Sequence, residues 1–327
     1  MSDTVDLVLE GGGVKGIGLV GAISVLEEHG MTFARVAGAS AGAIVGSLVA
    51  AGMCASDLQA LMTSLDYTRF RDDTKLDHLP VVGKGLSLWL DHGIYAGDYF
   101  HGWIRDQLSG LGVDTFHDLY QADPGSSLPA NEQYKLVVMT SDVSRGRLLR
   151  LPWDYISDDI EADKQSVADA VRASMSIPFF FRPVTLDIPK AASSTLVDGG
   201  MLSNFPVDSF DRSDGKPPRW PTIGIKLSAQ QVPNQVVHEV KGDLSLALGM
   251  LGTMQSWHDQ MHLNDPTVQK RTIFVDTFGV NATDFSIDKP TQQKLYDNGR
   301  KAAEAFLGGP GVEPGEWVRT TEAAKRG

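Results

Sequence analysis

The sequence is poor in several features that would each define a class of protein. It has a single cysteine, Cys54, among 327 residues, which excludes an internal disulfide and a cysteine-rich zinc site. No apolar run approaches the roughly 18 residues of a transmembrane helix, and the acidic start does not resemble a signal peptide. We therefore expect a reducing compartment, most simply the cytoplasm, with signal-independent secretion left open. We expect the lone thiol to be buried and inert.

Basic residues are also scarce. The chain has 29 Lys and Arg against 41 Asp and Glu, a net charge of −12. This balance argues against nucleic acid as a partner and against docking on anionic lipid through a basic patch. A hydrophobic fraction of 42% is ordinary for a soluble globular protein. No repeat or linker divides the chain, so we predict one domain over residues 1–310, with a lid-like excursion at 66–95 and a C-terminal tail at 311–327.

Short apolar runs alternate with helical patterns along the chain. We predict strands at 5–9, 36–39, 135–140, 194–197, 222–227 and 272–275, and helices at 16–28, 41–51, 57–65 (capped by Ser56), 98–108, 166–174, 243–263 and 291–307. This alternation is typical of an α/β fold with a parallel sheet. Ligands bind such sheets beyond the carboxyl ends of the strands, which directs attention to the turns that follow them.

Two glycine turns follow the first two predicted strands. The first, Gly11-Gly12-Gly13-Val14-Lys15-Gly16, offers backbone N–H groups that no side chain blocks. The second, Gly38-Ala39-Ser40-Ala41-Gly42, is the pattern of a sharp strand-to-helix turn that presents a serine hydroxyl. A serine nucleophile needs donors for its oxyanion, and the N–H groups of Ala41 and of the first turn can supply them. Either turn alone has an ordinary explanation as a tight turn or an anion site, but together they indicate acyl transfer.

Asp198 is the candidate base. It follows a short apolar strand and precedes Gly199 and Gly200, so its carboxylate should emerge at the end of that strand. Asp-Gly-Gly also begins ordinary β-turns, which leaves a purely structural role open. A carboxylate can accept the serine proton if its oxygen lies within about 2.6–3.2 Å and if apolar surroundings raise its basicity.

Four motifs together resemble the patatin-like phospholipases. That family carries Gly-Gly-Gly-x-Arg/Lys-Gly after its first strand, then Gly-x-Ser-x-Gly, an Ala-Ser-x-Ser-x-Pro block and a late Asp-Gly-Gly/Ala. In this sequence the four are Gly11 to Gly16, Gly38 to Gly42, Ala173 to Pro178 and Asp198 to Gly200, in the same order. The resemblance spans residues 5–200 and is thinner beyond residue 210.

The resemblance implies a three-layer α/β fold with a mostly parallel central sheet flanked by helices, and a lipid acyl hydrolase that uses a Ser-Asp dyad without histidine. It implies no metal or organic cofactor, and a phospholipid or another acyl-ester lipid as substrate, met at a membrane surface. The implied residues are Ser40 as nucleophile and Asp198 as base, Gly11, Gly12, Gly13 and Ala41 in the oxyanion hole, and Gly38, Gly42, Lys15, Gly16, Gly199 and Gly200 as support of the turns. A solvated lysine at a helix start is the alternative for Lys15.

Two other functions stay open at this point. Ser40, Asp198 and either His258 or His262 would fill the Ser, Asp, His order of an α/β-hydrolase esterase, although those enzymes place the serine turn after several strands. The two histidines are spaced i, i+4 but lack the glutamate of a His-Glu-x-x-His zinc motif, so a helix surface explains them better than a metal. The third reading is a non-catalytic lipid or anion binder with an idle serine. An apolar helical face at 243–263 could line an acyl channel, but a core-facing helix is the simpler explanation.

Overall fold

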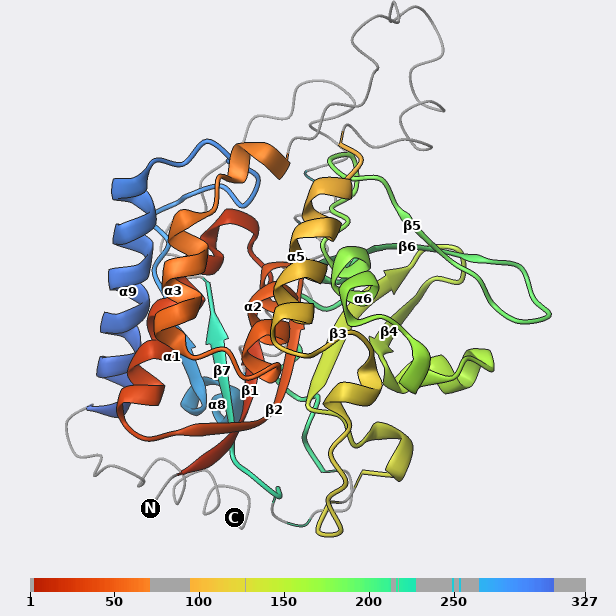
Figure 1. Ribbon diagram of the computed structural model, residues 1–327. Coiled ribbons are helices and arrows are strands. Elements are labelled where there is room, and N and C mark those ends of the chain that lie inside the picture. Colours follow the sequence, from red (N-terminus) through yellow and green to blue (C-terminus); the bar gives the residue numbers. More distant parts are fainter. Residues whose placement is uncertain are drawn as a thin grey trace, which may run out of the picture.

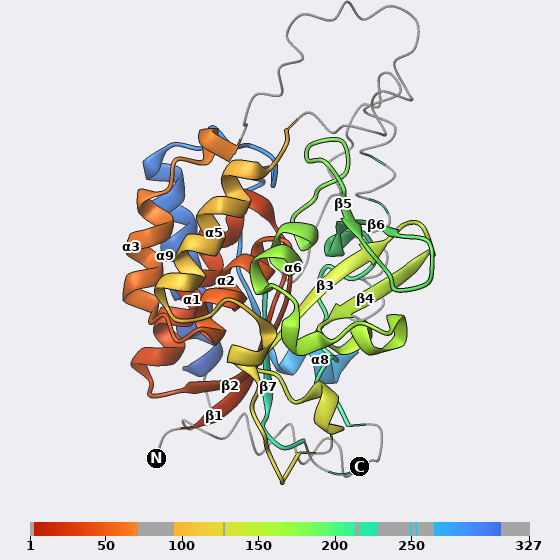
Figure 2. The same cartoon turned by 45° about the vertical axis from the view of Figure 1, so that its right-hand side comes forward.

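The computed structural model describes residues 3–70, 95–126, 128–212, 216, 218–227, 249, 253 and 265–308. Their centre is an eight-stranded mixed sheet in the order β5-β6-β3-β2-β1-β7-β8. The eighth strand, β4, pairs with the edge of β3 opposite to the edge that β2 and β6 share. The strands are β1 (Thr4–Leu9), β2 (Thr32–Ala39), β3 (Leu136–Asp142), β4 (Arg147–Leu151), β5 (Val184–Leu186), β6 (Ser194–Asp198), β7 (Thr222–Lys226) and β8 (Thr272–Phe274). The run β3-β2-β1-β7-β8 is parallel, whereas β4 and β6 are antiparallel to β3 and β5 is antiparallel to β6. Figure 2 shows this antiparallel part of the sheet most clearly.

Helices flank the sheet (Figure 1). The α-helices are α1 (Ile17–Glu28), α2 (Ala41–Ala50), α3 (Ala55–Ser64), α5 (Asp98–Gly110), α6 (Val167–Ser174), α8 (Pro266–Lys270) and α9 (Lys289–Leu307). The 3₁₀ turns are η1 (Gly13–Gly16), η2 (Tyr67–Phe70), η3 (Phe116–Leu119), η4 (Ala130–Glu132), η5 (Trp153–Asp158), η6 (Ala162–Lys164) and η7 (Gly199–Met201). Helices α1 and α9 cross in close contact because Gly21 of α1 faces the backbone of Tyr296 and Gly299 of α9 faces the backbone of Gly18.

The site depends on the first two β-α units, and their sequence explains why they form. Strands β1 and β2 bury nearly every side chain, which accounts for their continuous apolar runs. Helix α2 consists almost entirely of small and apolar residues and is buried nearly all round, so it can lie directly against the strands. The carboxyl ends of β1 and β2 therefore open at one edge of the sheet, followed by η1 and α2.

The predicted strands and helices within the described residues are confirmed, with ends shifted by a few residues, and the sheet is mostly parallel as predicted. Two strands, β4 and β5, were not predicted from the sequence. The predicted cap at Ser56 is wrong: α3 begins at Ala55, whose N–H donates to the Glu27 carboxylate at 2.8 Å, so Ser56 is already inside the helix. The expectation of a buried thiol is also wrong, because Cys54 is exposed at the start of α3.

Several predictions fall outside the described residues. These are most of the lid-like excursion at 66–95, the tail at 311–327, nearly all of the helix at 243–263, and both His258 and His262. The predicted domain boundaries therefore stay predictions. Within the described part of the chain, no helix is long and apolar enough to cross a membrane.

Candidate active site

Ser40 stands at the sharp turn between β2 and α2. Its backbone has a φ of 49°, in the left-handed region that side chains other than glycine rarely adopt. A Cβ on Gly38 would lie 2.5 Å from the carbonyl carbon of Gly42, and a Cβ on Gly42 would lie 2.7 Å from that of Leu9. Both flanking glycines are therefore required by close backbone approach, as the pentapeptide pattern predicts.

Asp198 reaches the level of Ser40 through the register of the sheet. Ala39, at the end of β2, pairs with Met139 of β3, and Asp198, at the end of β6, pairs with the next residue of β3, Thr140, on the same edge of that strand. Strand β4 pairs with both Met139 and Thr140 along the opposite edge. Because β6 runs antiparallel to β3, its carboxyl end stops level with the turn after β2. The structure thus brings together two residues that lie 158 positions apart in the sequence.

The Asp198 carboxyl group is buried, with 3% of the residue exposed. Burial raises its pKa to about 7, while the nearby Ser40 hydroxyl and the hydrogen bond from the N–H of Gly200 lower it only in part. The Gly200 N–H donates to Oδ1 at 2.7 Å. The other oxygen, Oδ2, is buried without a hydrogen bond of ordinary length and angle. The Ser40 hydroxyl therefore lies near enough to influence the carboxylate, in the loose geometry common for catalytic pairs without substrate.

The glycine loop after β1 differs in detail from its predicted role. The N–H of Gly11 donates to the carbonyl oxygen of Asn204 at 3.0 Å, so it is not available to an oxyanion. Within the described residues, the N–H groups of Gly12, Gly13 and Ala41 form no hydrogen bond. Gly13 has a φ of 56° and its α-carbon faces a backbone carbonyl, which explains why only glycine fits there. The candidate oxyanion donors thus narrow to these three N–H groups.

A buried network of charged and polar groups, which was not predicted from the sequence, lies next to the glycine loop after β1. Glu10, directly before the glycines, forms an ion pair with Lys226 of β7, and both side chains are about 95% buried. Its carboxylate also accepts hydrogen bonds from the N–H of Leu227 and, at 3.3 Å, from the Asn204 side chain. A charged residue at the end of an apolar strand was the available signal for Glu10. No sequence signal pointed to Lys226 as its partner, because the two residues are 216 positions apart.

Lys15 belongs to the same network. Burial lowers its pKa, and the nearby Glu10 partly opposes that shift. Its Cε would lie 3.3 Å from a Cβ on Gly12, so the side chain folds back along the loop. Lys15 is partly buried in this position, and its role in supporting the loop stays a prediction. Gly16 approaches Ala41 closely, which brings the loop against the serine turn.

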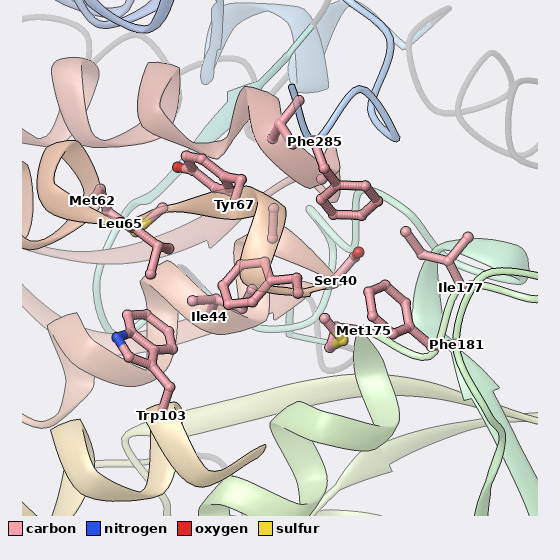
Figure 3. Close-up of a pocket in the computed structure, with 14 residues that line it drawn as sticks. Ser40, Ile44, Met62, Leu65, Tyr67, Trp103, Met175, Ile177, Phe181 and Phe285 are labelled. Atoms are coloured by element: carbon pink, nitrogen blue, oxygen red, sulfur yellow. The ribbon is translucent and has the colours of Figure 1, made fainter. Parts of the chain in front are cut away.

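A small apolar cavity opens at Ser40 (Figure 3). Gly13, Val14, Ser40 and Ala41 form one part of the lining, and the remainder is aliphatic, aromatic and thioether side chains: Ile44, Met62, Leu65, Tyr67, Phe70, Trp103, Met175, Ile177, Phe181 and Phe285. Figure 3 shows the Ser40 hydroxyl near Phe285, Ile177 and Phe181, with Trp103, Met62 and Leu65 on the side away from it. None of the described histidines lines this cavity.

The described residues hold no group of three or more His, Cys, Asp or Glu side chains that could hold a metal ion. The site consists instead of a serine at a strained turn, a buried carboxyl group beside it, three unbonded N–H groups and an apolar cavity. These features together are the ones that a serine acyl hydrolase requires.

Comparison with known proteins agrees with this class. The family model of patatin-like phospholipases matches residues 7–211. The chain is 34% identical to the uncharacterized protein YqhO of Bacillus subtilis, over 93% of this chain and 98% of YqhO. It is 24% identical to lysophospholipase NTE1 of Eremothecium gossypii, over 62% of this chain and 11% of that protein. The crystal structure of VipD from Legionella pneumophila matches with a TM-score of 0.54 at 19% identity, covering 94% of this chain and 67% of VipD.

The chain therefore belongs to the patatin-like phospholipase family, and it has the α/β fold of that family. Membership supports a lipid ester hydrolase as the general class of activity. The assignment of individual residues to catalytic steps rests on the geometry above.

Proposed function

We propose that this protein hydrolyses fatty-acyl esters of phospholipids or lysophospholipids through an acyl-serine intermediate on Ser40, with Asp198 as the base. The observation that carries the proposal is the meeting of three features: the Ser40 hydroxyl, the buried Asp198 carboxyl group with its unbonded Oδ2, and the mouth of an apolar cavity. Neutral glycerides and small esters are the next substrate classes.

In the first step Ser40 Oγ attacks the ester carbonyl carbon while its proton passes to Asp198 Oδ2. The N–H groups of Gly12, Gly13 and Ala41 stabilise the negative charge that develops on the carbonyl oxygen. Collapse of the tetrahedral intermediate breaks the ester bond, and the alcohol leaves with the proton that Asp198 has taken up. In the second step Asp198 accepts a proton from water, whose oxygen attacks the carbonyl carbon of the acyl-enzyme. Collapse of this tetrahedral intermediate breaks the bond to Ser40 Oγ, Asp198 returns the proton to that oxygen, and the fatty acid leaves.

The apolar cavity supports a fatty acyl chain as the group that binds beside Ser40. Its lining apart from Ser40 and the loop backbone offers hydrocarbon, aromatic and sulfur surface, and an alkyl chain gains about 0.8 kcal/mol per buried methylene. A charged or hydroxylated group would lose its hydration there without compensation. We place the acyl chain in this cavity and the leaving alcohol outside it, with the enzyme acting in the cytoplasm.

A fluorophosphonate probe tests the nucleophile directly. We expect one adduct on Ser40, located by mass spectrometry, and none in Ser40→Ala. Asp198→Asn should lose activity by about 1,000-fold or more on a short ester, since the carboxylate serves in both steps. His258→Gln and His262→Gln are the matched variants for the esterase alternative. Full activity in Asp198→Asn, or its loss in either histidine variant, would overturn the dyad. The absence of any adduct in folded protein would favour an anion or lipid binder.

The substrate class needs a separate experiment. Release of free fatty acid from a panel of phospholipids, lysophospholipids, glycerides and short esters, scored by mass spectrometry, ranks the candidates. Highest turnover on a lysophospholipid or phospholipid supports the proposal. Turnover confined to short esters would contradict a lipid substrate.

A further inference from the structure

A single turn of backbone holds the main chain of both proposed catalytic residues. This turn is formed by the C-terminal end of α6 and the residues directly after it, and it includes Ser174, the last residue of α6, and Ser176. The N–H of Ser40 donates to Ser174 Oγ at 2.9 Å, and the N–H of Asp198 donates to the carbonyl oxygen of Ser176, also at 2.9 Å. Both serines are completely buried. The separation of the two catalytic side chains therefore depends on the position of this one turn.

Arg172, in the last turn of α6, fixes the position of the turn. Its Nη1 donates to Ser176 Oγ at 2.5 Å, and that hydroxyl donates back to the Arg172 carbonyl oxygen at 2.9 Å. Its Nη2 donates to the carbonyl oxygens of Ala96 at 2.7 Å and Arg182 at 3.1 Å. One guanidinium thus ties the turn to the segment before α5 and to the segment before β5. Hydrogen bonds from an ionised donor are stronger than those between neutral groups.

The residues around Arg172 pack closely against its planar guanidinium group. Gly97 has a φ of 77°, and a Cβ there would lie 2.5 Å from the guanidinium carbon of Arg172. That carbon lies 5.9 Å from the ring centre of Phe181, which lines the cavity at Ser40. Only 7% of Arg172 is exposed. The charge is therefore held against carbonyl oxygens and the ring of a residue that lines the cavity.

We propose that Arg172 is a positioning residue for the Ser40–Asp198 pair, acting through Ser176 and the turn that holds both catalytic backbones. This inference rests on the proposed function for the meaning of the pair, but its geometry is independent of the substrate. A lysine cannot replace the guanidinium, because one ammonium group cannot donate in the same fixed plane to a hydroxyl and two separate carbonyl oxygens.

Arg172→Lys tests the proposal, with Arg271→Lys as its matched control. Arg271 is likewise 7% exposed and donates through both Nη atoms, to Asp211, away from the cavity. We expect Arg172→Lys to lower kcat on a short ester by about 10- to 100-fold, the scale set by misplaced reacting groups, with KM nearly unchanged. Arg271→Lys should keep the turnover of its folded fraction. Equal kcat in the two variants would overturn the proposal.

A double-mutant cycle identifies the route. Ser176→Ala removes the hydroxyl that Arg172 Nη1 contacts but keeps the carbonyl that holds Asp198. If Arg172 acts through Ser176, the double variant should lose little more activity than Arg172→Lys alone. Full additivity of the two losses would contradict action through this hydroxyl.

Backbone hydrogen exchange provides a readout that does not need activity. We expect the amides of Ser40 and Asp198 to exchange faster in Arg172→Lys than in Arg271→Lys, when measured in folded protein. Unchanged exchange at both amides would overturn the positioning role. Failure of the proposed function would be seen separately, as a wild-type protein that a fluorophosphonate does not label, and the exchange experiment would still decide whether Arg172 holds the two backbones.

Discussion

Oδ1 of Asp198 accepts a hydrogen bond of 2.7 Å from the N–H of Gly200, two residues further along the chain. This bond fixes one carboxylate oxygen within the turn and leaves Oδ2 without a hydrogen bond, which is the oxygen that we propose exchanges a proton with Ser40. Gly199 lies between them with its α-carbon against the backbone of Met139, where no side chain fits. The Asp-Gly-Gly sequence thus forms a turn that also holds the proposed base, so its structural explanation is compatible with the proposed catalytic role.

The pH dependence of activity follows from the raised pKa of Asp198. Burial raises that pKa to about 7, and only the ionised carboxylate can accept the Ser40 proton. We expect kcat/KM on a short ester to rise with pH and to level off above an apparent pKa near 7. A profile that is already flat near pH 5 would mean that Asp198 is ionised there and is not tuned by burial.

The stability of the protein should decrease with rising pH over the range in which its activity increases. Between the usual aspartate pKa of 3.8 and about 7, the folded protein keeps a proton on Asp198 that the unfolded chain has released. The free energy of unfolding should therefore fall as pH rises through this window and level off above it. At about 1.4 kcal/mol per pKa unit, the loss is at most on the order of 4 kcal/mol. Asp198→Asn should be more stable than wild type above pH 7 and equal to it near pH 4, as measured by urea unfolding.

Asp6 acts in the same direction and must be separated from this effect. Burial raises its pKa to about 6, against the opposing influence of Arg35. Because Asp198→Asn keeps Asp6, the difference between the two proteins isolates Asp198. A difference that does not change with pH would contradict the assignment.

Gly42→Ala and Gly102→Ala form a matched pair of glycine substitutions, both within helices. A Cβ at position 42 would press into the backbone of Leu9 and Glu10, whereas one at position 102, in α5, would meet nothing within 4 Å. We expect Gly42→Ala to lose activity and about 2 kcal/mol or more of stability through overpacking. Gly102→Ala should gain about 0.5–1 kcal/mol, the difference in helix propensity. Thermal unfolding measures both, and equal effects would contradict the close approach at the serine turn.

The buried ion pair beneath the glycine loop predicts a strong asymmetry between single and double variants. Glu10→Gln leaves the Lys226 ammonium buried without its counter-charge, which typically costs about 3–5 kcal/mol. Combining it with Lys226→Met, which keeps the packing over Phe205, should restore most of the stability. The exposed pair Glu161–Lys164 is the control, where Glu161→Gln should change stability by less than about 1 kcal/mol. Additive losses in the double variant, by urea unfolding, would argue against the pair.

The sequence predicted the parts of this site that are local in the chain. The turn around Ser40, the glycine loop and the Asp-Gly-Gly turn each have a short signature, because each is required by backbone geometry within about six residues. The parallel strands of the sheet were also predictable, because each strand or helix has its own hydrophobic pattern within a short stretch of sequence. Asp198 was identified as the candidate base because its turn has a recognisable sequence, Asp-Gly-Gly, and that role stays a prediction.

Contacts between distant segments were not predictable from one sequence. The register that sets Asp198 level with Ser40 depends on β6 running antiparallel to β3, and a five-residue strand carries no sign of its direction. The bond from Gly11 to Asn204, which removes one expected oxyanion donor, joins residues 193 positions apart. The cavity lining is drawn from many segments, and each of its side chains is indistinguishable from core in the sequence.

The final prediction concerns acyl-chain length, which the far side of the cavity should set. Trp103 lies in the lining on the side away from Ser40 (Figure 3). While a chain still finds apolar surface, each added methylene should raise kcat/KM by about fourfold, equivalent to about 0.8 kcal/mol. The gain should stop where Trp103 closes the cavity. Trp103→Ala removes this wall, so its optimum should move to longer chains while turnover of the shortest ester stays the same.

Tyr99→Ala is the control that distinguishes the opening of the cavity at Trp103 from a general loss of packing around α5. Tyr99 lies on the same helix as Trp103, and both pack against the ring of Phe70. The ring centroid of Phe70 lies 6.0 Å from that of Tyr99 and 6.1 Å from that of Trp103. Tyr99, however, does not line the cavity. Its removal should lower stability without moving the chain-length optimum. Initial rates across a series of p-nitrophenyl esters of increasing chain length give the comparison. If both variants shift the optimum alike, the effect comes from loosening α5, and if neither does, the acyl chain does not occupy this cavity.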